Sequence, residues 1–143
     1  SFDRPPFRVT IREVSDRSFR LGDTRIRPAT VKHAPRLHCV GYRIEYQDHV
    51  VAYSGDSLYC DSLVKLCRDA DVAILDCSFP ENEPGAGHLH AGECGRVAQE
   101  AGIDRLVLSH FYPIAEQYDV RAQAASYFSG RVRMAKDLLL VTG

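Results

Sequence analysis

The sequence Val72-Ala73-Ile74-Leu75 is an uninterrupted apolar run, and Arg105-Leu106-Val107-Leu108 repeats much of that pattern further along the chain. Short apolar runs of this kind are typical of strands that are buried on both faces of a sheet. Between them, residues 91–101 favour a helix that ends at Gly102, a residue suited to the left-handed conformation of a helix stop. This alternation of strand and helix predicts parallel strands with helices packed against them.

The residues before this unit have a different pattern, in which apolar and polar side chains alternate. Such alternation predicts short strands joined by turns. The polar link Tyr46-Gln47-Asp48-His49 between two apolar runs favours a hairpin. A short amphipathic helix is expected over residues 58–67. The strands of this meander are expected at residues 7–14, 19–21, 26–32, 40–46 and 50–53.

The last part of the chain is expected to hold a helix over residues 114–128 and terminal strands over residues 132–134 and 138–141. Taken together, the segments predict an α/β (α+β) fold, a mixed sheet with helices on one face. The other face of such a sheet needs cover. A single domain over residues 1–143 is expected, because 143 residues fall within the size of one domain.

Composition narrows the function classes. The 18 basic and 19 acidic side chains nearly cancel, so no global field draws the chain to nucleic acid or anionic lipid. Five cysteines without CxxC spacing favour free thiols in a reducing cytoplasm over a structural zinc site. No apolar run approaches the roughly 20 residues that span a bilayer, and a signal peptide is not recognisable, so a cytoplasmic protein is expected. The start at Ser1 rather than Met suggests that an N-terminal portion is missing.

Two candidate metal ligands follow predicted strands directly. Asp56 lies in Tyr53-Ser54-Gly55-Asp56-Ser57, where Gly55 allows a sharp turn that leaves a carboxylate at the strand end. His110 ends the apolar strand Leu106-Val107-Leu108-Ser109, and imidazole is the commonest protein ligand of zinc. Taken singly, Asp56 is better explained as a turn or helix-capping residue than as a ligand. His110 alone is explained equally well as a ligand and as a hydrogen-bonded structural histidine.

Further histidines precede the helix at residues 91–101. His88 lies in Gly87-His88-Leu89-His90-Ala91, beside a helix N-terminus that attracts anions such as phosphate. Because alternate residues of an extended segment point to the same side, His88 and His90 could form a two-residue metal clamp; the simpler interpretation of His90 is a neighbour of the helix N-cap. His38 and His49 are individually weak candidates.

In their order and spacing, these segments resemble the second half of the metallo-β-lactamase fold, particularly the branch that includes ribonuclease Z. The resemblance runs from about His33 to the C-terminus, and the closing Met134-Ala135-Lys136-Asp137-Leu138 resembles the last hairpin of that family. The natural C-terminus is therefore expected to be present. The other motifs that carry it are Gly41-Tyr42-Arg43-Ile44, Tyr53-Ser54-Gly55-Asp56-Ser57, Ala70-Asp71, Asp76-Cys77-Ser78-Phe79, His88-Leu89-His90 and Leu108-Ser109-His110-Phe111.

The resemblance implies a role for each candidate. Asp56 matches the aspartate that bridges two metal ions, and His110 matches the final histidine on the second ion. His88 matches the histidine that protonates the leaving group, and Asp76 falls where ribonuclease Z has a glutamate that orients it, which makes an acid relay. His33 matches a recurring histidine upstream, for which contact with substrate is expected more than metal binding.

The sequence also departs from that family. The hallmark His-x-His-x-Asp-His does not occur in the 143 residues, and two ligands are fewer than the three that a catalytic zinc requires. The expected partner is therefore the missing N-terminal half or a second copy of the chain. Phe111-Tyr112-Pro113 stands where ribonuclease Z has Ser-x-Arg-Tyr after the final histidine, and with the near-zero charge this argues against transfer-RNA processing.

Three hypotheses follow. The first is a hydrolase in which two divalent ions, most simply zinc, generate a hydroxide that attacks a phosphodiester or other ester while His88 assists departure of the leaving group. The second is a non-catalytic fragment or subunit that needs a partner chain to complete the fold and site. The third is an inactive scaffold that keeps the motifs. The fold alone does not select the substrate.

Overall fold

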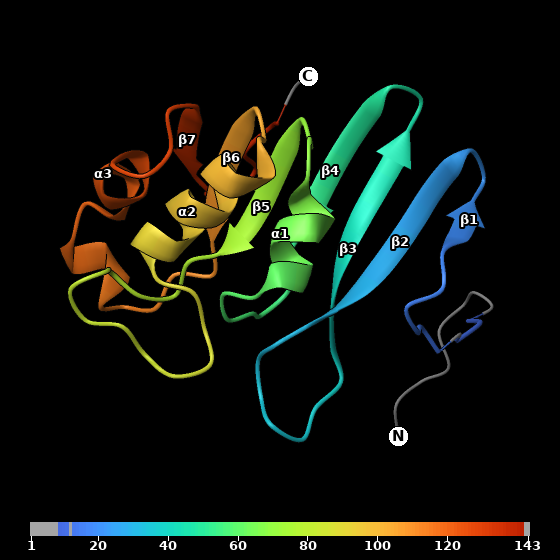
Figure 1. Cartoon of the computed structure of the whole chain (residues 1–143), viewed down its shortest axis with the longest axis horizontal. Coiled ribbons are helices and arrows are strands. Elements are labelled where there is room, and N and C mark those ends of the chain that lie inside the picture. Colours follow the sequence, from blue (N-terminus) through green and yellow to red (C-terminus); the bar gives the residue numbers. More distant parts are fainter. Residues whose placement is uncertain (1–8, 12, 142–143) are drawn as a thin grey trace.

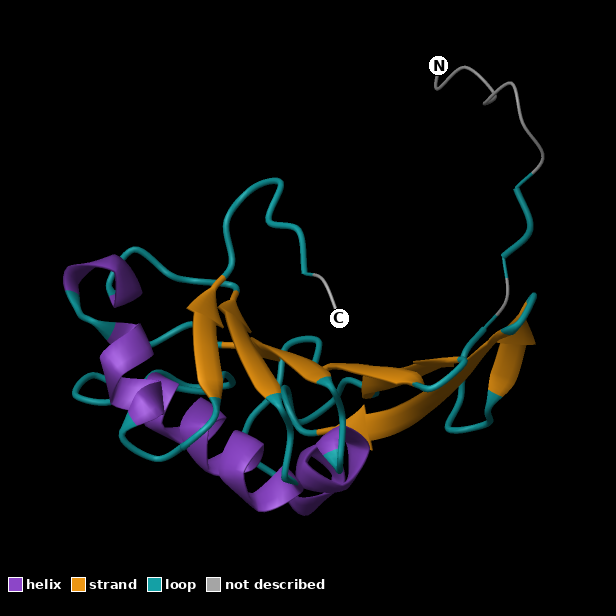
Figure 2. Ribbon diagram, turned by 90° about the horizontal axis from the view of Figure 1, so that it is seen from above, coloured by secondary structure: helices purple, strands orange, loops and turns teal. Residues whose placement is uncertain are grey.

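The computed structural model describes residues 9–11 and 13–141, and in these residues it forms one seven-stranded sheet. Helices cover one face of this sheet, as Figures 1 and 2 show. None of the described helices is long and apolar enough to cross a membrane. The elements, in chain order, are β1 Phe19–Leu21, β2 Thr24–Val31, β3 Cys39–Tyr46, β4 His49–Tyr53, α1 Asp61–Cys67, β5 Val72–Asp76, α2 Ala91–Ala101, β6 Arg105–Ser109, the 3-10 helix η1 Ala115–Gln117, α3 Val120–Ala125 and β7 Arg131–Met134.

The strands lie side by side in the order of the sequence. Strands β1 to β4 pair antiparallel, and β4 to β7 pair parallel. The pairing changes from antiparallel to parallel at β4. Before it, a tight turn at Gln47, which has a positive φ of 52°, joins β3 to β4. After it, helices connect the strands, as parallel neighbours require. The predicted mixed sheet with helices on one face is confirmed.

The core lies between the helices and this face of the sheet. Ala52, Ala73 and Leu106 are directly paired across β4, β5 and β6, and all three are completely buried. Leu63 of α1 and Val97 of α2 pack onto them from the helix layer. Alternate strand residues therefore supply the core, as the period of a strand requires.

The opposite face of the sheet carries a second apolar surface. Tyr53, Ile74 and Val107 are directly paired across β4, β5 and β6, so their side chains share a face, and they belong to no part of the helix-side core. The C-terminal segment runs over this side in Figure 2. We call this surface the open face. It includes a groove of about 360 Å³ lined by His49, Val50, Val51, Asp71, Val72, Ile74, Arg105 and Val141.

Three predicted elements differ from the structure. The helix predicted over residues 114–128 is interrupted, because Tyr118 is extended (φ −129°, ψ 154°) and Asp119 starts a new helix as its N-cap. The helix predicted over residues 58–67 begins only at Asp61, because the backbone N–H of Leu58 is bonded to the carbonyl of Lys32. The strand predicted over residues 138–141 is wrong, since Leu138 has a positive φ of 61° and pairs with no strand.

The first predicted strand, residues 7–14, is also absent where the structure describes it. Residues 9–11, 13 and 14 have no strand conformation, and Ile11 is 87% exposed. Residues 7, 8 and 12 lie outside the described part of the chain. An alternating pattern forms a strand only when a neighbouring strand accepts its backbone hydrogen bonds.

Helices α2 and α3 approach closely at Gly95, which gives a first test of the fold. A Cβ atom at Gly95 would lie 2.3 Å from the carbonyl oxygen of Ala124. We expect Gly95→Ala to lower the free energy of unfolding by about 1–3 kcal/mol through overpacking, against the gain of roughly 0.5–1 kcal/mol that the exchange gives in an unhindered helix. Urea unfolding measures the difference.

The matched control is Gly92→Ala in the same helix. There the nearest atom to the new Cβ, at 2.6 Å, is the Glu81 Oε1 at the end of a flexible side chain, which can move aside. We therefore expect a smaller loss for Gly92→Ala than for Gly95→Ala. A Gly95→Ala variant that is as stable as the original chain would contradict this packing.

Candidate metal centre

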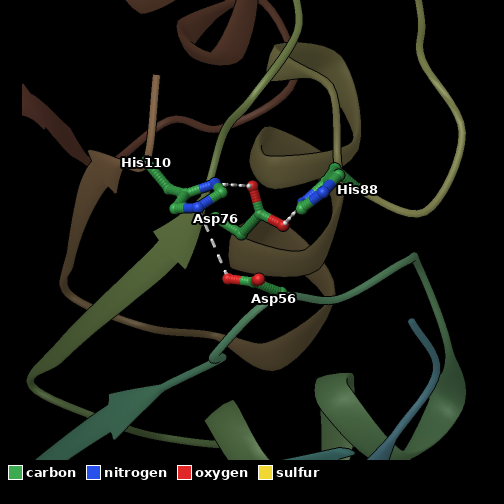
Figure 3. Close-up of side chains that lie close together, drawn as sticks. All are labelled: Asp56, Asp76, His88 and His110. Carbon is green, nitrogen blue, oxygen red and sulfur yellow. Dashed lines mark hydrogen bonds and ion pairs between the residues drawn. The ribbon is translucent and has the colours of Figure 1, made fainter. Parts of the chain in front are cut away.

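Four side chains from different parts of the chain meet at one edge of the sheet (Figure 3). Asp56 follows β4, Asp76 is the last residue of β5, and His110 follows β6. Because these strands are parallel, their carboxyl ends share one edge, which is where α/β sheets place their sites. His88 joins them from the loop before α2. One ligand atom from each of the four lies within 4.8 Å of the others.

Positive backbone φ angles position Asp56 and His110 in the site. Gly55 has a positive φ of 59°, which turns the chain after β4 so that Asp56 faces the site. Ser54 ties this turn to β5, since its hydroxyl donates to the Gly55 carbonyl at 2.6 Å and accepts the Asp76 N–H at 2.9 Å. His110 has a positive φ of 60°. This conformation is uncommon for a residue with a side chain and clusters at functional sites.

Asp76 is the organising carboxylate. Its side chain is 1% exposed, and it accepts hydrogen bonds from the backbone N–H of Ser57 at 3.1 Å and from the Ser78 hydroxyl at 2.6 Å. The Asp76 Oδ2 also lies 2.7 Å from the His88 Nδ1. Because a carboxylate only accepts, His88 carries its proton on Nδ1. Both oxygens of Asp76 are thus engaged, as buried charges require.

Asp56 and His110 are the more exposed pair. Their side chains are 46% and 42% exposed, and the Asp56 Oδ1 lies 3.6 Å from the His110 Nε2. Among the described residues, the Asp56 carboxylate makes no hydrogen bond, and the contact with the His110 ring is too long to be one. One carboxylate and one imidazole nitrogen, both open to solvent, form a donor set that suits zinc or a similar divalent ion. The residues present therefore fit a metal ion, with two protein ligands.

The loop that carries His88 is held from two sides. The Nδ1 of His33 lies 2.7 Å from the Gly87 carbonyl, and the His33 and His88 rings are 4.8 Å apart. On the other side, Tyr127 donates a hydrogen bond to Glu81 at 2.6 Å, and Tyr118 donates to Glu83. These hydrogen bonds raise the pKa of both tyrosines.

The remaining histidines lie elsewhere. His90 is the N-cap of α2, where its ring accepts the Glu93 N–H and the Glu93 carboxylate accepts the His90 N–H. His90 is thus the N-cap itself rather than a neighbour of it, and the four-residue cluster does not include it. His38 contacts Thr30 and Asp16, and His49 opens β4 at the hairpin.

Sequence reasoning assigned no role to two residues that touch the site. The Ser78 hydroxyl lies 2.8 Å from the His110 Nδ1, and the Tyr112 hydroxyl lies 3.3 Å from the His88 Nε2. One signal was available for Ser78. It is two residues after Asp76, and alternate residues of an extended segment share a side. Tyr112 has no comparable signal, because its contact depends on how the segment after His110 folds back.

Comparison with known proteins gives a consistent result. Residues 1–111 match the family described as the beta-lactamase superfamily domain. A probable metallo-hydrolase, YhfI of Bacillus subtilis, is 36% identical over 114 residues, which are 76% of this chain and 47% of the relative. Ribonuclease Z of Thermobifida fusca is 34% identical over 113 residues, 74% of this chain and 36% of the relative.

A solved structure agrees with the sequence matches. The crystal structure of the metallo-beta-lactamase fold protein YhfI superimposes with a TM-score of 0.79 at 34% identity, covering 85% of this chain and 50% of that one. The match thus spans about half the length of YhfI and about a third of that ribonuclease Z. On the family match, the sequence relatives and the superposition together, the chain belongs to the metallo-β-lactamase superfamily.

Proposed function

We propose that this chain contributes half of the active site of a metal-dependent hydrolase that cleaves a phosphodiester or other ester. The observation that carries this proposal is the division of the four clustered residues into two pairs. Asp56 and His110 keep solvent-exposed donor atoms, whereas Asp76 and His88 are buried and bonded to each other. The first pair suits a cation and the second suits proton transfer.

Asp56 and His110 would hold the metal, with two divalent ions, most simply zinc, in the complete site. Bound there, the ions would supply a Lewis acid that activates water. The Asp56 carboxylate has two free oxygens and can contact two cations at once, while the His110 Nε2 can contact one.

His88 would serve as the acid. Asp76 fixes the proton on the His88 Nδ1, so Nε2 is the nitrogen that can take up a second proton and give it to a leaving oxygen. Asp76 stabilises the resulting imidazolium across the 2.7 Å contact. Tyr112 occupies the Nε2 side at 3.3 Å and must yield to a substrate oxygen. His33 lies beside the His88 ring and would line the substrate side.

The site needs ligands from beyond this chain. Two protein ligands are fewer than the three that a catalytic zinc requires, and the chain matches only about half of the length of YhfI. The open face also keeps apolar side chains partly exposed, such as Tyr53 at 45%, and a second segment could cover them. We propose that one further segment supplies both the missing ligands and the cover, as an N-terminal half in the same protein or as a separate chain.

Completion of the site gives the test. A chimaera joins this chain to the segment of YhfI that it does not match. Zn²⁺ binding is measured by titration calorimetry, and hydrolysis is measured separately with bis(p-nitrophenyl) phosphate as substrate. We expect weak binding and no hydrolysis with this chain alone, and two ions per molecule with measurable hydrolysis for the chimaera. A chimaera that folds but binds no ion would favour the inactive scaffold.

A second candidate function, a non-catalytic subunit, is favoured by the open face itself. Ile74 lies in the groove of that face, and a charge there should oppose any apolar partner. We expect Ile74→Asp to weaken binding of the missing segment, supplied in trans, at least tenfold. Leu21→Asp is the control, because Leu21 is 60% exposed and lies outside the groove.

The result separates the two candidates. Loss of segment binding together with loss of hydrolysis supports the completed enzyme. Segment binding that depends on Ile74 but gives neither ion binding nor hydrolysis supports the subunit. If Ile74→Asp and Leu21→Asp bind the segment equally well, the open face is not its binding surface.

A further inference from the structure

Ser78 lies between the two pairs of the site. Its side chain is completely buried. Its hydroxyl lies 2.6 Å from the Asp76 Oδ1, 2.8 Å from the His110 Nδ1 and 3.1 Å from the His110 carbonyl oxygen. The two candidate roles, metal binding at His110 and proton transfer at Asp76 and His88, are thus connected through one hydroxyl group.

A hydroxyl has a single proton to donate, so these contacts cannot all be donated by Ser78. The bond to the buried Asp76 carboxylate is the shortest of the three, and bonds to a charged acceptor are stronger than those to a neutral one. The Ser78 proton therefore lies toward Asp76. Of the two other contacts of the hydroxyl, the His110 carbonyl oxygen can only accept, so the His110 Nδ1 is the atom that can donate to the Ser78 oxygen.

That direction determines which nitrogen of His110 is free. With a proton on Nδ1, the neutral ring has its lone pair on Nε2, and Nε2 is the atom that lies 3.6 Å from the Asp56 Oδ1. Two acceptors then face each other across the exposed side of the site. Such an arrangement is unfavourable in water alone and favourable around a cation.

We propose that Ser78 is a positioning residue that holds His110 in the tautomer with the proton on Nδ1 and so presents Nε2 as a metal ligand. The identity of what binds rests on the proposed function, but the tautomer does not. Asp76 consequently orders both imidazoles. It accepts from His88 directly through Oδ2, and it orders His110 through the Ser78 hydroxyl at Oδ1.

The position of His110 does not depend on this hydroxyl. The backbone N–H of Cys77 donates to the Ser109 carbonyl at 2.8 Å, and the N–H of Tyr112 donates to the Ser78 carbonyl at 3.2 Å. These bonds clamp the two segments on both sides of His110. Without the hydroxyl, the direct contact of 3.5 Å from the His110 Nδ1 to the Asp76 Oδ1 is too long for a good hydrogen bond. Loss of the hydroxyl should therefore release the tautomer and leave the ring in place.

The experiment reads the tautomer by NMR on chain labelled with ¹⁵N-histidine, without metal, in alkaline buffer where imidazole is neutral. His110→Gln identifies the His110 signals. We expect the Nδ1–H form in the original chain, a mixture that includes the Nε2–H form in Ser78→Ala, and recovery of the Nδ1–H form in Ser78→Thr, which keeps the hydroxyl. Titration with Zn²⁺ should show affinity about tenfold weaker for Ser78→Ala, as loss of a partner behind a ligand does, and restored for Ser78→Thr.

Two results would overturn the inference: an original chain in which the His110 Nε2 carries a proton, or a Ser78→Ala variant whose tautomer does not change. Neither depends on metal binding. If the tautomers behave as expected but the completed site binds no Zn²⁺, the proposed function fails and the role of Ser78 stands. A thermal unfolding curve for each variant shows whether the comparison is between folded proteins.

Discussion

Asp56→Ala is expected to abolish divalent-ion binding by the completed site and to lower its hydrolytic rate by about 10³-fold, roughly 4 kcal/mol of activation free energy. The Asp56 carboxylate is the donor whose oxygens are free of other described partners, and no neighbour can replace it. Asp76 is nearby, but both of its oxygens are committed to Ser57, Ser78 and His88.

The same substitution should leave the fold almost unchanged. Asp56 is exposed, and its 3.6 Å contact with the His110 ring is open to solvent; contacts of this exposed kind contribute at most about 1 kcal/mol. A large loss of ion binding with little loss of stability distinguishes a ligand from the turn or capping residue that Asp56 could be on sequence grounds. A capping residue would show the opposite, with a loss of about 1 kcal/mol of stability and no change in ion binding.

The measurements are Zn²⁺ titration, hydrolysis of bis(p-nitrophenyl) phosphate and urea unfolding, all on the chimaera. Asp48→Asn serves as the control, because Asp48 is an exposed aspartate in a turn remote from the site. Ion binding by Asp56→Ala equal to that of the control variant would show that Asp56 is not a ligand.

The sequence predicts the placement of Asp56 and His110 because each follows an apolar strand, and parallel strands bring their carboxyl ends to one edge. The sheet and α2 are predicted for a related reason. Apolar periodicity depends on burial, and Gly102 ends α2 in the left-handed conformation that its lack of a side chain allows.

Periodicity fails where tertiary contacts decide the backbone. The apolar residues 138–141 resemble a strand, yet Leu138 and Leu140 are exposed, and the C-terminal segment runs along the side of the sheet that no described helix covers (Figure 2). Of these four residues, Val141 lines the groove of the open face, so the apolar run does not mark a place in the sheet.

The directions of the hydrogen bonds inside the site cannot be predicted from the sequence pattern, for a different reason. Whether Ser78 donates to Asp76 or to His110 depends on differences of a few tenths of an ångström among three atoms. Such differences arise from the packing of β5, β6 and the loop before α2 together. The residue types indicate which chemistry is available, and the geometry is needed to assign the protons.

Asp76→Ala should have the largest effect on stability among the site residues. It removes a buried charge that accepts hydrogen bonds from Ser57, Ser78 and His88, two of which are completely buried. Because buried donors without partners are costly, we expect the free energy of unfolding to fall by about 3–5 kcal/mol. Urea unfolding measures the loss.

The control lies at the other end of the same strand. Asp71 precedes β5, and its carboxylate accepts the backbone N–H of Val50 at 2.6 Å. We expect Asp71→Ala to cost about 1.5–3 kcal/mol, the range for one hydrogen bond to a charged group. Asp71 also lines the groove of the open face, so hydrolysis is measured in the chimaera, where the added segment is covalently attached, and there we expect no change in hydrolysis per folded molecule. If Asp71→Ala is as damaging to hydrolysis as Asp76→Ala, then stability alone explains both.

Asp76→Asn separates the structural role from the chemical one. The amide keeps the shape of the carboxylate, but with its oxygen toward Ser78 its NH2 group replaces Oδ2. The Ser57 N–H then loses its acceptor, and His88 must move its proton to Nε2. A neutral ring with that tautomer is not polarised by a negative charge behind it, and a comparable exchange in a serine protease triad lowers turnover by about 10⁴-fold. We expect a fall in hydrolysis of at least 10²-fold, with a smaller loss of stability than Asp76→Ala. Near-normal hydrolysis by Asp76→Asn would show that Asp76 only supports the fold and that His88 is not the acid.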